Sequence, residues 1–185
     1  CGLAFEFLAD QMDPNLQEDK KVMIGHEQGK ITMNVAEAND AVREKMRMDM
    51  NERYRTLLGH FRHEIGHYYW FVLLENNEDL LKEFRNVFGD EREDYNMALQ
   101  KYYQEGRPDN WQRQFVSAYA SSHPWEDWAE SWAHYLHMFD TIETASEWGL
   151  SFKLRKDNMT QTMSLEHQFQ SFDELREQWV HLTCT

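Results

Sequence analysis

Residues 54–70 read Tyr-Arg-Thr-Leu-Leu-Gly-His-Phe-Arg-His-Glu-Ile-Gly-His-Tyr-Tyr-Trp, a stretch that predicts one helix. It contains the pattern His-Glu-x-x-His, whose fixed members are His63, Glu64 and His67. Side chains four residues apart lie on one helix face, so both imidazoles can bind one tetrahedral zinc ion. Glu64 projects from the same turn, where a carboxylate can take a proton from zinc-bound water. The pattern therefore predicts a zinc hydrolase with two ligands and a general base.

The residues around the pattern argue against a simpler hypothesis, in which His and Glu form only the solvated face of an ordinary helix. Apolar residues recur at three- and four-residue steps, which predicts a buried stripe along the helix. The members of this stripe are Leu57, Leu58, Phe61, Ile65, Tyr69 and Val72. We expect His63, Glu64 and His67 on the adjoining face.

Length and composition fit one domain with a substantial core, because 41% of the 185 residues are hydrophobic and 14% are aromatic. The net charge of -14 argues against binding through a basic surface, so we expect neither nucleic acid nor a membrane as a partner. We found no bilayer-length apolar run and no secretory leader, which predicts a cytoplasmic protein. The chain begins at Cys1 instead of Met, so we also expect a fragment or a processed form.

The N-terminal segment, 1–36, holds the clearest strand of the sequence. Residues 30–35 alternate apolar Ile31, Met33 and Val35 with polar side chains, and residues 22–24 are a candidate neighbouring strand across a turn. Two interpretations stay open. The free edge of strand 30–35 can bind an extended peptide substrate, or the pair is a hairpin that only covers the helices.

The rest of the chain has mostly helical patterns. They cover 37–53, 78–88, 90–105, 111–121 and 172–182, whereas 151–164 has no clean periodicity. We therefore predict an α+β, mostly helical fold in which a small N-terminal β-sheet or hairpin packs on the motif helix. Residues 37–148 form its helical metal-site core and 149–185 its C-terminal segment, within a single domain, 1–185.

A second helix, 123–137, is the best source of a third zinc ligand. It reads His-Pro-Trp-Glu-Asp-Trp-Ala-Glu-Ser-Trp-Ala-His-Tyr-Leu-His, in which Pro suits the first turn and the apolar residues form one stripe. Four side chains of ligand type fall in a sector of about 80 degrees beside that stripe, at 100 degrees per residue. They are Glu126, Glu130, His134 and His137.

Within this row we choose Glu126 as the third ligand and Glu130 as the carboxylate that accepts a hydrogen bond from a ligand imidazole. Glu126 has another interpretation, since acids in a first helical turn favour the positive end of the helix dipole. His134, Tyr135 and Tyr68 are candidates for stabilising the oxyanion, and His134 or His137 is alternatively a ligand.

Both motifs together resemble the bacterial putative zinc-binding metallopeptidase family, over most of the chain. Glu-x-x-Ala-Glu at 126–130 is also similar to the third-ligand helix of gluzincin peptidases. The resemblance implies a zincin-like metallopeptidase domain with one zinc ion and Glu126 as ligand. Two features depart from the pattern. The Cys pairs of an intact amino-terminal zinc ribbon are missing, and the interval between His67 and Glu126 is long for gluzincins.

The sequence thus supports two functional hypotheses. The leading one is a zinc-dependent metallopeptidase that hydrolyses peptide bonds of a peptide or protein substrate, with Glu64 as general base. The alternative is a zinc-stabilised, non-catalytic protein-interaction module whose metal site is closed by a fourth protein ligand.

Overall fold

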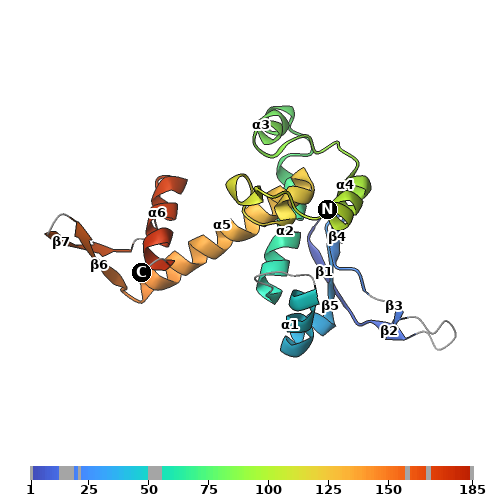
Figure 1. Ribbon diagram of the computed structural model, residues 1–185, viewed down its shortest axis with the longest axis horizontal. Coiled ribbons are helices and arrows are strands. Elements are labelled where there is room, and N and C mark those ends of the chain that lie inside the picture. The colour runs from blue at the N-terminus through green and yellow to red at the C-terminus, as the bar shows by residue number, and fades with distance from the viewer. Residues whose placement is uncertain are drawn as a thin grey trace. The chain divides into compact units, whose positions relative to one another are not determined.

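A computed structural model describes residues 2–12, 19–20, 22–49, 56–156, 159–165 and 168–183 (Figure 1). The chain forms two compact units, Cys1–Ala133 and His134–Thr185, which we describe separately. The predicted single domain over 1–185 stays a prediction. Cys1 and Cys184 lie outside the described residues.

In its described residues, the first unit contains five strands, five helices or parts of helices, and three 3-10 turns. The strands are β1 (Ala4–Leu8), β2 (Gln11–Met12), β3 (Asp19–Lys20), β4 (Gly25–Glu27) and β5 (Lys30–Asn34). The 3-10 turns are η1 (Val35–Ala38), η2 (Trp111–Arg113) and η3 (Tyr119–Ser122). The helices are α1 (Asp40–Asp49), α2 (Leu57–Leu73), α3 (Glu78–Phe88), α4 (Tyr95–Glu105) and the first part of α5 (Pro124–Glu147). The predicted α+β, mostly helical class is confirmed.

The N-terminal sheet has the order β1-β5-β4, with β1 parallel and β4 antiparallel to β5. β5 is therefore the central strand, and the prediction that strand 30–35 offers a free edge is wrong. Its antiparallel neighbour is β4 instead of residues 22–24. A tight turn with positive φ at Gln28 and Gly29 reverses the chain, so that Glu27 of β4 pairs with Lys30 of β5.

The sheet packs on α2, as predicted for the motif helix. Phe5 and Phe7 of β1 place their rings 5.7 and 6.1 Å from the ring of Phe61. At the other edge of the sheet, His26 of β4 contacts the rings of Tyr68 and Phe71. Contacts from both edge strands fix the sheet against one side of α2.

α5 covers a different side of α2, and this contact corrects the predicted stripe. The buried residues of α2 are Glu64, Gly66 and Trp70, whereas Leu58 and Val72 are 53% and 55% exposed. The face that carries the metal pattern is therefore turned inward. Periodicity identified a series of apolar residues on α2, but it did not predict the side of α2 on which α5 packs.

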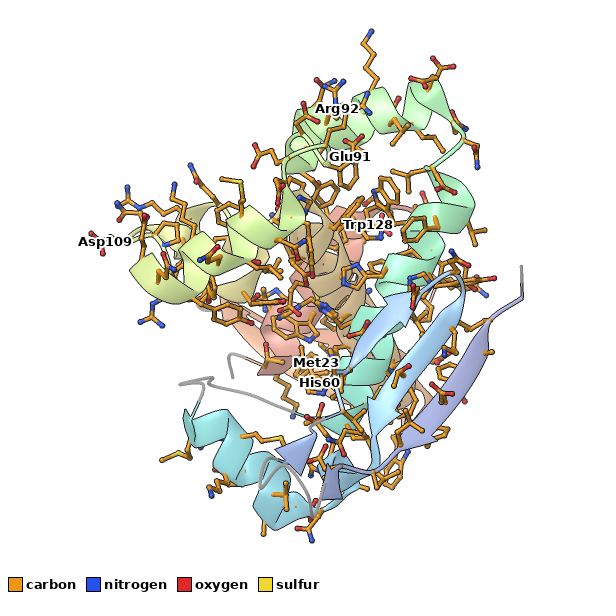
Figure 2. The ribbon with its side chains drawn as sticks, turned by 90° about the vertical axis from the view of Figure 1, so that its right-hand side faces the viewer. Met23, His60, Glu91, Arg92, Asp109 and Trp128 are labelled. Atoms are coloured by element: carbon orange, nitrogen blue, oxygen red, sulfur yellow. The ribbon has the colours of Figure 1, made fainter. Side chains whose placement is uncertain are left out.

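Gly66 allows the close approach of α5. The indole N–H of Trp128 donates to the Gly66 carbonyl at 2.9 Å (Trp128 is labelled in Figure 2). A Cβ at position 66 would lie 3.0 Å from the Cα of Ala129 and 3.1 Å from the Cβ of Trp132. Beside this crossing lies an apolar core of Trp70, Leu74, Leu81 and Phe84, with Phe88, Trp125 and Trp128 packed against it.

The interval between α2 and α5 differs in part from its predicted helices. α3 has the predicted bounds, but α4 begins at Tyr95, because the Asp94 side chain caps it by accepting from the Met97 N–H. The preceding turn is held by ion pairs of Arg92 with Asp90 and of Arg85 with the buried Glu91 (Figure 2 labels Glu91 and Arg92). The predicted helix 111–121 is wrong, since only the short turns η2 and η3 form there.

The second unit contains the end of α5, a hairpin of β6 (Ser151–Lys156) and β7 (Met159–Ser164), and α6 (Phe172–Thr183). Its core consists of Ile142, Ala145, Leu165 and Leu175. Gly149, at φ 66°, ends α5 in the left-handed conformation that glycine adopts without strain. Among the described residues, none of the helices has the length and apolar character needed to cross a membrane.

We expect Gly66→Ala to lower the free energy of unfolding by about 1–2 kcal/mol, because overpacking outweighs the better helix propensity of alanine. Denaturant titration followed by circular dichroism measures the change. Gly25→Ala is the control, since an added methyl group there meets nothing within 4 Å. A Gly66→Ala protein as stable as the parent would show that the helices can separate at no cost.

Candidate metal centre

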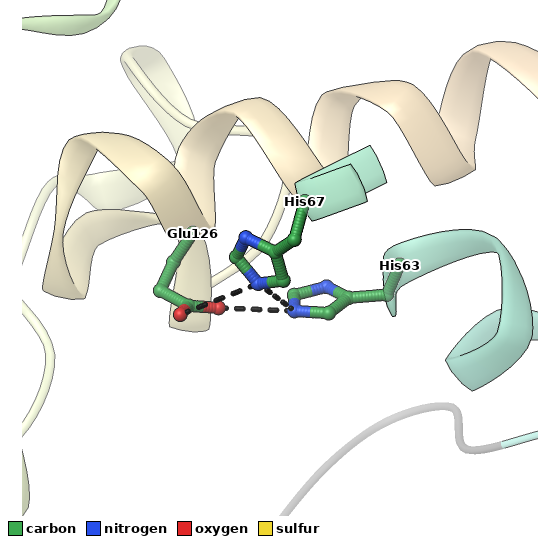
Figure 3. Close-up of side chains that lie close together, drawn as sticks. All are labelled: His63, His67 and Glu126. Carbon is green, nitrogen blue, oxygen red and sulfur yellow. Dashed lines mark hydrogen bonds and ion pairs between the residues drawn. The ribbon is translucent and has the colours of Figure 1, made fainter. Parts of the chain in front are cut away.

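The helix crossing brings three ligand-type side chains together (Figure 3). His63 and His67 come from α2 and Glu126 from the first turn of α5, and one ligand atom of each lies within 4.8 Å of the others. The two Nε2 atoms are 3.1 Å apart. Glu126 Oε2 lies 3.0 Å from His63 Nε2, and Oε1 lies 3.6 Å from His67 Nε2. These three residues could hold a metal ion.

The spacing fits zinc. Tetrahedral zinc with bonds of about 2.0–2.1 Å to nitrogen and oxygen separates neighbouring ligand atoms by roughly 3.3 Å. From His63 Nε2, the distances to Glu126 Oε2 (3.0 Å) and to His67 Nε2 (3.1 Å) are both close to this value. Among the described residues the cluster offers two imidazoles and one carboxylate, so a four-coordinate ion would keep one position for water or substrate.

Glu130 orients His63. Its Oε1 lies 2.7 Å from His63 Nδ1, and a carboxylate accepts, so Nδ1–H is the donor. The Nε2 atom is then the one directed toward His67 and Glu126. This is the geometry that the predicted role of Glu130 requires.

The electrostatics of the cluster favour a cation. Burial opposes the imidazolium form of His63, but Glu126 and Glu130 outweigh it and raise its pKa well above the ordinary value. Glu126 is 1% exposed. Burial alone would raise its pKa, but His63 and His67 reverse this and lower the pKa well below the usual range. Positive charge between these groups is stabilised, whether a proton or a metal ion supplies it.

Glu64 is also turned inward. It is 8% exposed, and its Oε2 has no hydrogen-bond partner among the described residues. A buried carboxylate oxygen without a partner is costly in a purely structural role. The orientation suits a group that takes up a proton during a reaction.

Two tyrosines that the sequence did not single out also lie at the site. The Tyr95 hydroxyl donates to Glu126 Oε1 at 2.6 Å, and the ring of Tyr119 lies 6.1 Å from that of His63. Burial and the charge of Glu126 raise the pKa of both phenols, so both keep their protons. No short motif marks them, because Tyr95 begins α4 and Tyr119 begins η3, in the interval between the two motifs.

His123 fixes the start of α5. Its Nδ1 accepts from the Trp125 N–H at 3.1 Å, so its Nε2–H is the donor to the Glu93 carbonyl at 3.2 Å. His123 is 3% exposed and joins the N-terminus of α5 to the turn that precedes Tyr95. It therefore orients the turn that carries Glu126.

The other candidate residues have different surroundings. His134 and Tyr135 belong to the second unit, where the exposed Tyr135 lies against Phe139 and Phe172. Tyr68 packs against His26 of β4. The oxyanion roles of His134, Tyr135 and Tyr68 stay predictions. One turn before His63, His60 (labelled in Figure 2) has its Nδ1 2.6 Å from an oxygen of the buried Glu37.

Comparison with known proteins shows a clear similarity. Residues 1–185 match a family described as putative zinc-binding metallo-peptidase. Uncharacterized proteins of Mycobacterium bovis and of two Mycobacterium tuberculosis strains, CDC 1551 and H37Rv, are each 48% identical to this chain over 150 residues. The alignment covers 81% of this chain and 42% of each relative, so the chain spans less than half the length of these curated relatives. No solved structure is significantly similar to the chain.

We expect the purified parent protein to carry about one zinc ion per chain, and Glu126→Ala to lose most of it, because two imidazoles alone leave the ion incompletely held. Elemental mass spectrometry on protein prepared without chelators measures the metal. Glu143→Ala removes an exposed acid from the same helix and should retain the metal. Full zinc in Glu126→Ala would place the third ligand elsewhere.

Glu130→Ala should weaken zinc binding by about 10- to 100-fold, since the His63 imidazole would lose the carboxylate that orients it. Competition with a chelator of known affinity gives the dissociation constant, again with Glu143→Ala as the matched control. Equal affinities of parent and Glu130→Ala would contradict the orienting role.

Proposed function

Because this chain belongs to the putative zinc-binding metallopeptidase family, we propose that it is a zinc-dependent metallopeptidase that hydrolyses peptide bonds. The observation that carries the proposal is the convergence of His63, His67 and Glu126 within 4.8 Å, with the buried Glu64 on the same turn of α2. Family membership supports a hydrolase, and the geometry supports one zinc ion held by these three residues.

Zinc, when bound, supplies a Lewis acid that polarises the scissile carbonyl and lowers the pKa of a coordinated water to about 7. The role of His63, His67 and Glu126 is to hold the ion and leave one coordination position open. Glu130 keeps the His63 imidazole in the required tautomer.

Glu64 is the general base of the proposal. It takes the proton from the attacking water and then passes it to the nitrogen of the leaving amine, so that no net proton is consumed at Glu64. Its free Oε2 supports this role, since no hydrogen bond to a described residue must break before the proton is accepted.

β4 is the proposed place where an extended substrate binds. One side of β4 pairs with β5, and the other side has no strand partner among the described residues. His26 of this strand packs against Tyr68, the residue that follows His67 on α2. Strand addition along β4 would bind peptide backbone regardless of sequence, and it replaces the edge first expected for strand 30–35.

The experiment that tests the function compares the parent with Glu64→Gln on a mixture of unstructured peptides, with mass spectrometry of the products. We expect the parent to cleave, a zinc chelator to stop cleavage, and Glu64→Gln to lose about 10²- to 10⁴-fold in kcat. Glu64→Gln should retain its zinc, because Glu64 is not a ligand of the cluster.

Cleavage by Glu64→Gln at the parent rate would show that Glu64 is not the base. Full zinc occupancy without any cleavage by the parent would favour the alternative of a non-catalytic, zinc-stabilised interaction module. In that case removal of zinc should also unfold the protein.

A further inference from the structure

The interval between the two motif helices supplies a group that contacts a predicted metal ligand. Tyr95, the first residue of α4, donates its hydroxyl proton to Glu126 Oε1 at 2.6 Å. This distance is typical of a strong hydrogen bond from a hydroxyl to a carboxylate. Tyr95 is thus bonded directly to the one carboxylate in the cluster of His63, His67 and Glu126.

The two oxygens of Glu126 have different surroundings. Oε1 accepts the proton from Tyr95. Oε2 is buried and faces His63, whose Nε2 lies 3.0 Å away. One oxygen therefore accepts a hydroxyl proton from the protein, while the other faces an imidazole of the cluster, where a cation would bind.

The phenol itself is firmly held. Its ring lies edge-on to His123 at 5.1 Å and is tilted against Trp125 at 5.9 Å. Packing against both rings limits rotation of the phenol, so its hydroxyl stays directed at Glu126.

We propose that Tyr95 is a positioning residue that holds Oε1 of Glu126 and thereby presents Oε2 alone to the metal. The inference rests on the proposed metal site. It goes beyond that site because Tyr95, a residue outside both motifs, determines how the third ligand, Glu126, binds the metal. A carboxylate that binds through both oxygens would take up part of the coordination sphere. Tyr95 keeps Glu126 to one bond, so a position stays available for water or substrate.

The test compares the parent with Tyr95→Phe and Tyr69→Phe. Phenylalanine keeps the ring and removes only the hydroxyl. Tyr69→Phe is the control, since the Tyr69 ring stacks on Trp132 at 4.9 Å. Two quantities are measured on each protein: the zinc dissociation constant, by chelator competition, and the visible absorption spectrum after replacement of zinc by cobalt(II), which reports the coordination geometry.

We expect Tyr95→Phe to weaken zinc binding by about 10- to 100-fold and to change the cobalt spectrum, since Glu126 becomes free to rotate or to bind through both oxygens. Tyr69→Phe should match the parent in both quantities. A merely structural role of Tyr95 would lower the stability of the protein without altering the spectrum of bound cobalt.

A cobalt spectrum of Tyr95→Phe identical to that of the parent would overturn the inference, whatever its zinc affinity. A parent protein that binds neither zinc nor cobalt would instead overturn the proposed metal site. The two failures are therefore distinguishable in one set of measurements.

Discussion

The close contact between α2 and α5 at Gly66 is the constraint on which the rest of the structure depends. Without a side chain at this position, the backbone of α5 at Ala129 comes near enough for Trp128 to donate to the Gly66 carbonyl. The same crossing turns the inner face of α2 toward the first turn of α5. His63 and His67 can meet Glu126 only because the helices are this close. Gly66 is therefore needed for the packing of α2 against α5, in addition to occupying a variable position of the His-Glu-x-x-His pattern.

Burial and charge act together around this crossing. Glu37, Glu64 and Glu126 are among the buried acids of a chain with a net charge of -14. A buried carboxylate is costly unless it is paired, and the cluster pairs Glu126 with two imidazoles and one phenol. A metal ion in the cluster would offset part of the acidic charge where water is excluded. The candidate metal site therefore uses residues that also contribute to stability.

The sequence predicted those features that depend on local spacing. His63 and His67 share a face because they lie one turn apart. Glu126 and Glu130 are also one turn apart on the second helix. The sequence could therefore predict that Glu126 lies near the two histidines. The bounds of α3 followed from helix-like composition that ends at Gly89. Features that depend on distant contacts were missed. β1 pairs in parallel with β5 across more than twenty residues, and the inward face of α2 is set by α5. Tyr95 carries no motif, since its role comes only from the position of α4.

The distance along the chain between the two halves of the candidate metal site has a consequence for how the protein folds. His67 and Glu126 are 59 positions apart, and α3 and α4 must form between them. Closing a loop of this length costs roughly 3–4 kcal/mol of chain entropy, by the logarithmic dependence on loop length. His63 and His67 are neighbours as soon as α2 exists, so they can capture an ion early, whereas Glu126 arrives only after the long loop has closed. Completion of the ligand set is then a late event in folding, and the rate at which a bound ion becomes resistant to exchange should follow the rate of tertiary assembly.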